Sequence, residues 1–175
     1  MATHSTLQGH TENRRAMIVL AVAIATLAAA YGSQYIGGLA PCELCLYQRW
    51  PWWAAIVLLL ASFIPAIGPA GRGGLVTLAG IGLIGGAGIA FYHVGVEQHW
   101  WAGPAACAGG AQPTSFAELQ KMMHEPVPRC DEPAWSMLGI SMAGYNGLLS
   151  LATGVFAVQT GLIGLRRREK ESAHG

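Results

Sequence analysis

The chain has 175 residues, of which 53% are hydrophobic and 11% are charged, and its net charge is +1 at pH 7. A soluble domain carries about 25% charged residues, so this composition excludes an ordinary water-soluble globular protein. The length suits roughly one domain, and neither the net charge nor any basic patch indicates a nucleic-acid partner.

Four stretches without a charged side chain predict four membrane-spanning helices. Each is long enough to supply the roughly 20 apolar residues that cross the hydrocarbon core of a bilayer. The alternative, a soluble protein with buried helices, would not require all four runs to reach that length. We therefore expect an all-α membrane protein, a four-transmembrane-helix bundle in contact with membrane lipid. The expected helices cover about residues 15–35, 49–67, 73–95 and 139–165.

Small residues at four-residue spacing let helix backbones approach closely within a bilayer. Three of the expected helices carry such a stripe, which predicts tight packing between them. The stripes are Ala21, Ala25, Ala29 and Ser33 in the first helix, Gly82, Gly86 and Ala90 in the third, and Gly139, Ala143 and Gly147 in the fourth.

The basic residues predict how the chain is oriented. With four spans, both termini lie on the same side of the membrane as the loop that contains Arg72. That side holds seven of the ten basic residues, so the positive-inside rule places residues 1–14 and 166–175 in the cytoplasm. We expect a multi-pass protein of the bacterial inner membrane, with periplasmic loops at about 36–48 and 97–138.

The first expected helix also has features of a signal peptide, because Arg14 and Arg15 precede its apolar run. That run exceeds the about 7–15 residues of a signal-peptide core. We therefore expect the segment to stay in the protein as a helix.

The second periplasmic loop contains a signal for a helix of its own. Ser115 and Glu118 have the spacing of a capping box, and Phe116 and Leu119 follow at helical spacing. We expect a short amphipathic helix from about 115 to 124 that lies along the membrane surface.

All four cysteines fall on the expected periplasmic side, where disulfides form and persist. Cys42 and Cys45 form a Cys-x-x-Cys motif, in which one thiol often has a lowered pKa. Cys107 and Cys130 are 23 residues apart and do not form a second close pair. A zinc site prefers two close pairs, so we expect no metal. Structural disulfides and a relay of two redox pairs both remain open on spacing alone.

Arg49 is a candidate partner for the thiol pair. A helix that continues through Cys45 would place Arg49 one turn away, where its charge supports a thiolate. Pro51 complicates this expectation, because proline lacks a backbone N–H and predicts either a kink or a helix that starts near Trp50. In the second case the sequence does not secure the contact between Arg49 and Cys45.

Three segments carry a family resemblance: "PCELCLYQRW" at 41–50, "YHVGVEQHWWAGPAAC" at 92–107 and "VPRCDEPAWSMLGISMAGYNG" at 127–147. Together they resemble the disulfide bond formation protein B (DsbB) family of membrane thiol:quinone oxidoreductases. The resemblance covers roughly residues 14–165. It implies an enzyme that reoxidises a periplasmic thioredoxin-like dithiol oxidase (DsbA-like) and passes the electrons to a membrane quinone, either ubiquinone or menaquinone.

The resemblance also implies a role for each cysteine. Cys107 and Cys130 would be the loop pair that meets the partner, and Cys107 would be the sulfur that the partner's thiolate attacks to form a mixed disulfide. Cys130 would then exchange with Cys42. Cys45 would be the thiolate that lies beside the quinone.

Two further residues follow from the same resemblance. Arg49 would support the Cys45 thiolate electrostatically. His93, at the periplasmic end of the third helix, would belong to the quinone site. Quinone reduction consumes two protons, and His93 or Glu97 is the candidate relay for them.

Two alternatives differ from this hypothesis in what they require. A vitamin-K-epoxide-reductase-like enzyme has a similar bundle but a Cys-x-x-Cys late in the chain, whereas here the motif precedes the second span. A disulfide-stapled membrane scaffold without redox turnover would tolerate a Cys45→Ser change with no redox consequence.

Overall fold

The computed structural model describes residues 2–107, 115–117, 120 and 128–173. Among these residues, four helical segments are long and apolar enough to cross a membrane, which confirms the expected four-span, all-α fold. These segments are Thr11–Tyr35, Glu43–Ser62, Pro69–Glu97 and Met142–Arg166. The described elements are α1 (Ala2–Tyr35), α2 (Glu43–Tyr47), α3 (Trp50–Ser62), α4 (Pro69–Glu97), a 3₁₀ turn η1 (Ala105–Cys107), β1 (Ser136–Met137), β2 (Ile140–Ser141) and α6 (Met142–Ala173).

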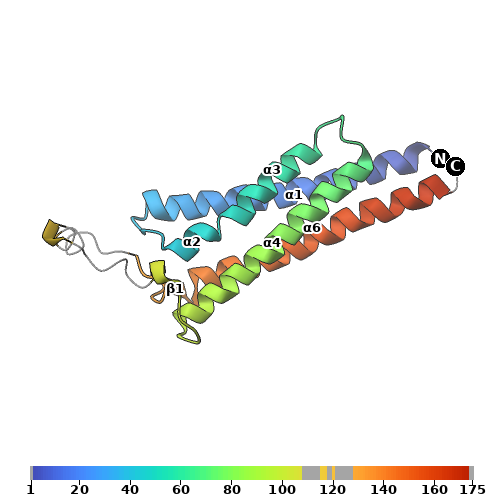
Figure 1. Ribbon diagram of the computed structural model, residues 1–175. Coiled ribbons are helices and arrows are strands. Elements are labelled where there is room, and N and C mark those ends of the chain that lie inside the picture. The colour runs from blue at the N-terminus through green and yellow to red at the C-terminus, as the bar shows by residue number, and fades with distance from the viewer. Residues whose placement is uncertain (1, 108–114, 118–119, 121–127, 174–175) are drawn as a thin grey trace.

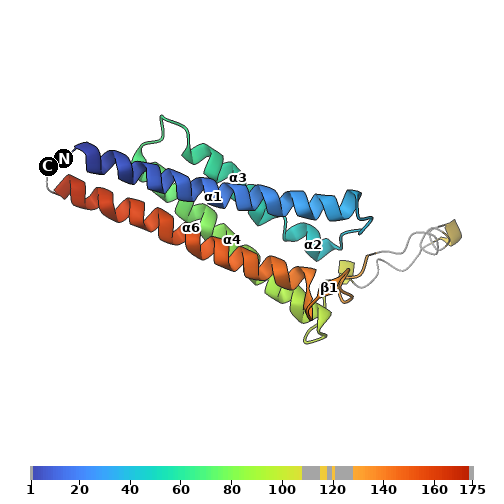
Figure 2. The same cartoon turned by 180° about the vertical axis from the view of Figure 1, so that it is seen from behind.

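The two ends of the bundle differ in what they carry (Figures 1 and 2). Both termini lie at one end, whereas α2 and β1 lie at the other. At the end with the termini, Arg72 donates to the Ser62 carbonyl at 2.9 Å and to Asn13 Oδ1 at 2.7 Å. This side chain therefore connects α4 to both α3 and α1.

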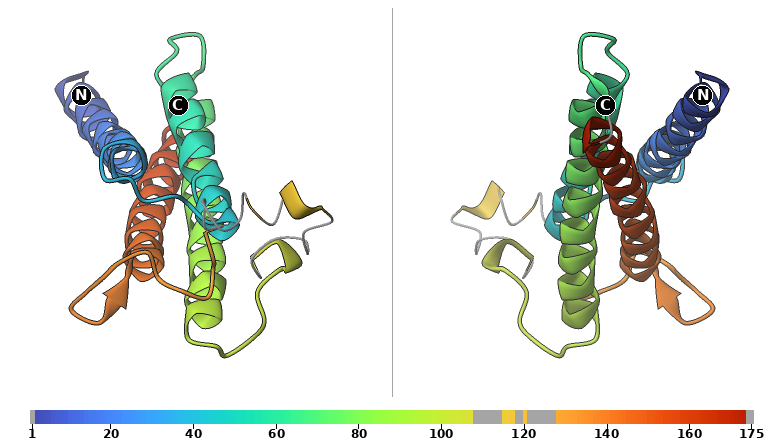
Figure 3. Two further views of the ribbon diagram at one scale, coloured as in Figure 1. Left: turned by 90° about the vertical axis from the view of Figure 1, so that its left-hand side faces the viewer. Right: turned by 90° about the vertical axis from the view of Figure 1, so that its right-hand side faces the viewer.

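The pair α4 and α6 forms the most extensive helix–helix interface, and α3 also packs against α4. α1 packs mainly against α3 and α6, so it lies at the side of the bundle (Figure 3). A Cβ atom added to Gly80 would lie 2.7 Å from the Gly154 carbonyl oxygen, and one added to Gly154 would lie 2.8 Å from the Gly80 oxygen. Only glycine permits this backbone contact, which is the kind of packing that holds helices together in lipid.

The expected small-residue stripes are confirmed only in part. A Cβ added to Gly147 would lie 3.2 Å from the Ala90 Cβ, as close packing between the third and fourth stripes requires. In contrast, Ala21, Ala25 and Ala29 of α1 are exposed. The buried stripe of α1 consists of Ala16, Val19, Ala23 and Leu27. α1 therefore packs partly through larger side chains rather than through close backbone contact alone.

Two expected helix boundaries were displaced by turn-forming residues. α3 ends at Ser62 rather than near residue 67, because Pro65 disfavours a helical conformation in the residue before it. α4 begins at Pro69 rather than at residue 73, since proline suits the first turn of a helix, where its missing N–H is not needed.

The fourth span begins at Met142 rather than at residue 139 because a short β-hairpin precedes it. Met137 pairs with Ile140, and the two residues between them, Leu138 and Gly139, have φ angles of 52° and 77°. Two positive φ values are typical of a two-residue hairpin turn.

Outside the spans, α1 and α6 extend beyond the expected residues 15 and 165, to Ala2 and Ala173. The predicted amphipathic helix at about 115–124 lies mostly outside the described residues. Within it, the described residues Phe116, Ala117 and Gln120 are helical.

Candidate functional site: a cluster of four cysteines

The Cys-x-x-Cys motif forms the beginning of α2. Cys42 is the N-cap residue, and its Sγ accepts a hydrogen bond from the Cys45 backbone N–H at 3.4 Å. The two sulfur atoms lie 2.9 Å apart, and both thiols are free. Pro51 lies in the first turn of a separate helix, α3, so of the two expected alternatives the structure has a helix start at Trp50 rather than a kink. This local arrangement lets the pair form a disulfide with little backbone movement.

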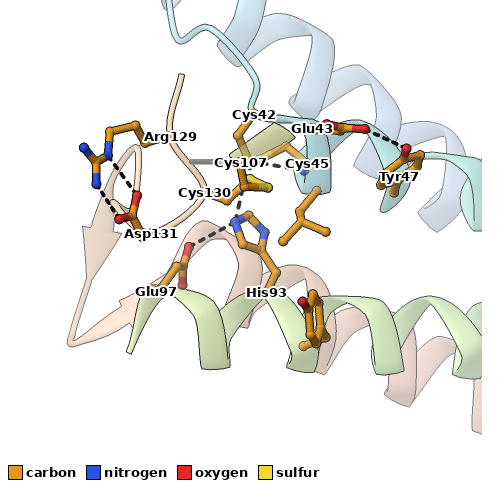
Figure 4. Close-up of a disulfide and its surroundings, with 12 residues drawn as sticks. Cys42, Glu43, Cys45, Tyr47, His93, Glu97, Cys107, Arg129, Cys130 and Asp131 are labelled. Carbon is orange, nitrogen blue, oxygen red and sulfur yellow. Dashed lines mark hydrogen bonds and ion pairs between the residues drawn. A yellow bond between two sulfur atoms is a disulfide. The ribbon is translucent and has the colours of Figure 1, made fainter. Parts of the chain in front are cut away.

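The second cysteine pair packs directly against the first. Cys107 and Cys130 form a disulfide with a Cα–Cα distance of 5.0 Å. Both are buried, with exposed fractions of 3% and 0%, and they share one apolar cluster with Cys42, Leu44 and Val96. Figure 4 shows this disulfide beside Cys42 and above His93. The fold therefore gathers all four predicted cysteines at the end of the bundle opposite the termini.

His93 faces the thiol pair from α4 (Figure 4). Its Nε2 lies 3.6 Å from Cys42 Sγ and 3.9 Å from Glu97 Oε1, and its Nδ1 lies 2.7 Å from Gln48 Nε2. His93 and Glu97 are 2% and 8% exposed. Within the described part of the chain, Glu97 Oε2 is buried without a hydrogen-bond partner. The His93 ring thus lies where it can donate a hydrogen bond to a thiolate.

The contacts of Cys42 favour its ionised form. The Cys45 thiol, the His93 ring and the Cys45 backbone N–H all donate to Cys42 Sγ and lower the pKa of its thiol to about 4. Burial acts in the opposite direction but is the weaker influence. Because the thiolate is the nucleophile in disulfide exchange, Cys42 is the more activated sulfur of the pair as the structure presents it.

Arg49 lies near the thiol pair but does not hydrogen-bond to it among the contacts that the structure describes. Its guanidinium donates to Gln34 Oε1 at 2.7 Å and to the Ala30 carbonyl at 3.5 Å, and it lies 4.7 Å from the centre of the Tyr31 ring. All three partners belong to α1. The break between α2 and α3 therefore directs Arg49 away from Cys45 and toward the first helix.

A cavity of about 240 Å³ lies beside these residues. Its polar lining includes both thiols together with Arg49, His93 and Glu97. Apolar side chains of α1 and α6 line other parts of it, among them Leu27, Ala30, Ala143 and Leu149. The cavity is slightly smaller than the about 300–1,000 Å³ of typical ligand pockets, which suits a ring-sized group.

Three polar residues at this site, two buried and one half-buried, form a network that was not predicted from the sequence. Gln48 contacts His93, Asn146 donates to Gln48 Oε1 at 2.7 Å, and the Trp52 indole donates to Asn146 Oδ1 at 2.9 Å. Gln48 and Trp52 are only 5% and 1% exposed. The sequence signal was a pair of amide side chains, Asn146 within an uncharged span and Gln48 just before another, where polar groups are costly unless they are paired.

One group of described residues has the spacing of metal ligands. The ligand atoms of Cys42, Cys45 and His93 all lie within 4.8 Å of one another. Structural zinc sites are almost always four-coordinate, and this group supplies three ligands.

Comparison with known proteins assigns the family. The family model described as "Disulfide bond formation protein DsbB" matches residues 12–160. The chain belongs to the DsbB family. An uncharacterized protein of Rickettsia prowazekii is 29% identical over 144 residues, which are 80% of this chain and 82% of that protein. Disulfide bond formation protein B 1 of Pseudomonas fluorescens is 29% identical over 171 residues, 93% of this chain and 95% of that protein.

A third relative, disulfide bond formation protein B of Hahella chejuensis, is 28% identical over 139 residues, 77% of this chain and 84% of that protein. No solved structure matches the chain significantly. The family match and the four apolar helices confirm the resemblance found in the sequence. The chain is a multi-pass membrane protein of disulfide bond formation, from a family of oxidoreductases.

Proposed function

We propose that the protein reoxidises a periplasmic thioredoxin-like dithiol oxidase by disulfide exchange and passes the electrons to a membrane quinone. The observation that carries this proposal is the gathering of all four cysteines in one buried cluster beside a cavity. A purely structural disulfide between Cys107 and Cys130 would not need a second, unpaired thiol pair packed against it. Family membership supports the same reaction class.

The electron path begins at the loop disulfide. A partner thiolate attacks Cys107 Sγ, which breaks the Cys107–Cys130 bond and releases Cys130 as a thiolate. Cys107 is 3% exposed, so this attack requires a local rearrangement that uncovers its sulfur. A mixed disulfide now joins the partner to Cys107, and the Cys130 thiolate is free to attack another disulfide.

The second exchange connects the two pairs. When Cys42 and Cys45 are joined as a disulfide, the Cys130 thiolate attacks Cys42 Sγ and displaces Cys45 as a thiolate. The partner's second thiolate attacks its own sulfur in the mixed disulfide, which completes the partner's disulfide and frees Cys107. The Cys107 thiolate then attacks Cys130, which restores the loop disulfide and leaves Cys42 and Cys45 reduced. One disulfide has formed in the partner, and two electrons rest on the Cys42–Cys45 pair.

We propose a quinone ring as the occupant of the cavity. The Arg49 guanidinium would supply hydrogen-bond donors for a carbonyl oxygen, and the His93 ring would border the quinone beside the thiol pair. The apolar side chains of α1 and α6 suit a ring and an isoprenoid tail. Glu97 Oε2, buried and unpartnered in the described structure, is a polar atom that a bound group or a proton can satisfy. A bound quinone would supply the oxidant, since it accepts two electrons and two protons. Ubiquinone and menaquinone both meet this requirement.

We propose that the cysteine cluster faces the periplasm and that the protein lies in the bacterial inner membrane. Residues 1–14 and 166–175 would then be cytoplasmic, on either side of a membrane domain at 15–165. The positive-inside distribution supports this orientation. Both termini also lie at the end of the bundle opposite α2, which the Cys-x-x-Cys motif begins (Figure 1).

A reconstituted assay tests the proposed function. The purified protein in lipid vesicles is mixed with a reduced thioredoxin-like oxidase and either ubiquinone or menaquinone, and quinone reduction is followed by absorbance. We expect one quinone reduced for each partner disulfide formed. A protein that binds partner and quinone without this turnover would instead be a scaffold.

A further inference from the structure

A chain of four contacts, two buried and two partly buried, leads from α3 to the thiol pair. The Trp52 indole donates to Asn146 Oδ1 at 2.9 Å, and the Asn146 amide donates to Gln48 Oε1 at 2.7 Å. Gln48 Nε2 lies 2.7 Å from His93 Nδ1, and His93 Nε2 lies 3.6 Å from Cys42 Sγ. The members come from α3, α6, the residue that follows α2, and α4. The chain therefore connects three spans to one sulfur atom.

The donor at the beginning of this chain determines the direction of every bond in it. An indole N–H is a donor only, so Asn146 must present its oxygen to Trp52 and its NH₂ group to Gln48. Gln48 then accepts through Oε1 and presents its own NH₂ group to His93 Nδ1. The Leu44 carbonyl oxygen, 3.3 Å from Gln48 Nε2, favours the same orientation of this amide.

The direction of the last amide bond determines which ring nitrogen of His93 carries the proton. An amide N–H can approach a ring nitrogen only where that nitrogen has a free lone pair. His93 Nδ1 is therefore unprotonated, and the ring proton resides on Nε2, which faces Cys42 Sγ and Glu97. A second proton on the ring would place two donors 2.7 Å apart, at Nδ1 and Gln48 Nε2.

We propose that Gln48 is a positioning residue which, oriented by Asn146 and Trp52, keeps His93 Nδ1 unprotonated and directs the Nε2–H at Cys42 Sγ. His93 then acts as a neutral hydrogen-bond donor to the thiolate rather than as a cation or a base. This inference rests on the proposed thiol chemistry of the site, and it adds the residues that set the state of the histidine.

The direction of the hydrogen bond from Gln48 to His93 Nδ1 also affects whether metal ions can bind. The ligand atoms of Cys42, Cys45 and His93 lie within 4.8 Å of one another, close enough to hold a thiophilic cation between them. A metal needs the lone pair of Nε2, and a hydrogen-bonded partner on the other ring nitrogen decides whether that lone pair is free. With the proton held on Nε2, the reduced dithiol is protected from zinc.

The charged and titratable groups around His93 and Cys42 come from several elements. Arg49 is engaged with α1, and Arg129 donates to Asp131 at 2.9 Å. The groups that face the site are Glu97 from α4, Cys45 from α2, Arg49 from the turn after α2, and Arg129 and Glu132 from the segment around Cys130. None of these groups contacts Nδ1 among the described residues, so Gln48 is the group that controls that nitrogen.

Two substitutions should exchange the donor and acceptor roles at His93 Nδ1 while they keep a side chain of nearly the same size. In Gln48→Glu the carboxylate still accepts from Asn146 but can only accept from His93. In Asn146→Asp the new carboxylate accepts from Trp52 and from Gln48, so the Gln48 amide rotates and presents its oxygen to His93. Both variants should therefore place a proton on Nδ1. Asn13→Asp is the matched control, because Asn13 lies at the other end of the bundle and accepts from Arg72.

The direct measurement is the ¹⁵N spectrum of the histidine rings. The full-length protein, reduced by a phosphine and held in lipid nanodiscs without partner or quinone, is compared with its variants, and His93 is assigned by its loss in His93→Gln. We expect Nδ1 to be unprotonated in the wild type and in Asn13→Asp, and protonated in Gln48→Glu and Asn146→Asp. Trp52→Phe should give a mixture. A protonated Nδ1 in the wild type overturns the inference, as does an unprotonated Nδ1 in both polarity-reversing variants.

Zinc protection provides a second readout that a purely structural role would not change. Zn²⁺ is titrated against alkylation of Cys42 in the same reduced proteins, with peptide mapping to identify the sulfur. We expect Zn²⁺ to block alkylation of Cys42 in Gln48→Glu at a concentration about tenfold or more below that needed in the wild type. Equal protection of both proteins contradicts the inference. Neither measurement needs turnover, so absence of quinone reduction would refute the proposed function alone, and a wild-type Nδ1–H would refute this inference alone.

Discussion

The two ends of the α4–α6 interface are built on opposite principles. At the glycine end, defined by Gly73, Gly80, Gly154 and Gly161, the two backbones lie so close that an added Cβ would meet backbone atoms of the other helix. At the cysteine end, defined by the four cysteines together with Trp52, Asn146, Gln48 and His93, polar side chains hydrogen-bond to one another across the spans. Close backbone contacts at the glycine end hold the two helices together. The cysteine end can therefore carry polar side chains, which would be costly in contact with lipid.

The largest expected effect is a loss of turnover without a loss of stability at the cysteine end. Cys45→Ser removes the sulfur that closes the Cys42–Cys45 disulfide, so no site remains to hold the two electrons. We expect quinone-coupled oxidation of the partner to fall to background, whereas thermal unfolding in detergent changes little. Normal turnover of this variant would favour the scaffold alternative.

Nearly as large an effect distinguishes the two cysteines of the loop pair. In Cys130→Ser, Cys107 is a thiol, and its thiolate should attack the disulfide of an oxidised partner. This exchange forms a partner–Cys107 mixed disulfide, releases the partner's second cysteine as a thiol, and leaves a covalent adduct that the loop cannot resolve. Cys107→Ser should retain the Cys42–Cys45 disulfide but form no adduct. Non-reducing electrophoresis measures both. If the adduct appeared in Cys107→Ser instead, the order of exchange would have to be reversed.

An intermediate effect is expected at the glycine end. In Gly80→Ala the new Cβ lies 2.7 Å from the Gly154 carbonyl oxygen, so the helices must separate, at a cost of about 1–3 kcal/mol typical of overpacking. Gly82→Ala is the matched control, since its Cβ would meet no atom within 4 Å. Unfolding in detergent should show lower stability for Gly80→Ala alone. Equal stability of the two variants would show that close backbone contact at the glycine end does not hold α4 and α6 together.

The smallest expected effect concerns how alkylation of Cys42 depends on pH. Because contacts with Cys45 and His93 lower the pKa of Cys42 to about 4, its thiolate persists as pH falls and is lost only when pH passes through that value. Relative alkylation of Cys42 in the reduced protein should therefore change little from pH 8 to pH 6. An ordinary thiol, with a pKa of about 8.5, serves as the control and loses reactivity roughly tenfold per pH unit in this range. A matching loss at Cys42 would show that its thiolate is not stabilised.

Much of the fold follows from the sequence because lipid imposes a simple requirement. A span needs a long uncharged run, and four such runs predicted the four spans. The three-residue spacing of Cys42 and Cys45 predicted their contact because it is local. Cys107 and Cys130 were predicted to pair only through the family resemblance, since nothing local brings together residues 23 apart.

Other features depend on contacts that the sequence does not display. The Ala21 stripe was expected at an interface but faces outward, because small residues also occur on exposed helix faces. The hairpin turn at Leu138 and Gly139 lacks the usual Asn-Gly signal. Gln48 and Asn146 are 98 residues apart, so their contact emerges only when α6 packs beside the turn that follows α2.

The central claim is that the loop pair and the membrane pair can exchange directly, and one crosslink tests it. The double variant Cys45→Ser, Cys107→Ser leaves Cys42 and Cys130 as the two sulfur atoms of the cluster. After mild oxidation in lipid vesicles and peptide mapping, we expect a Cys42–Cys130 disulfide in most molecules. Two thiols that both remain open to alkylation after oxidation would contradict the relay.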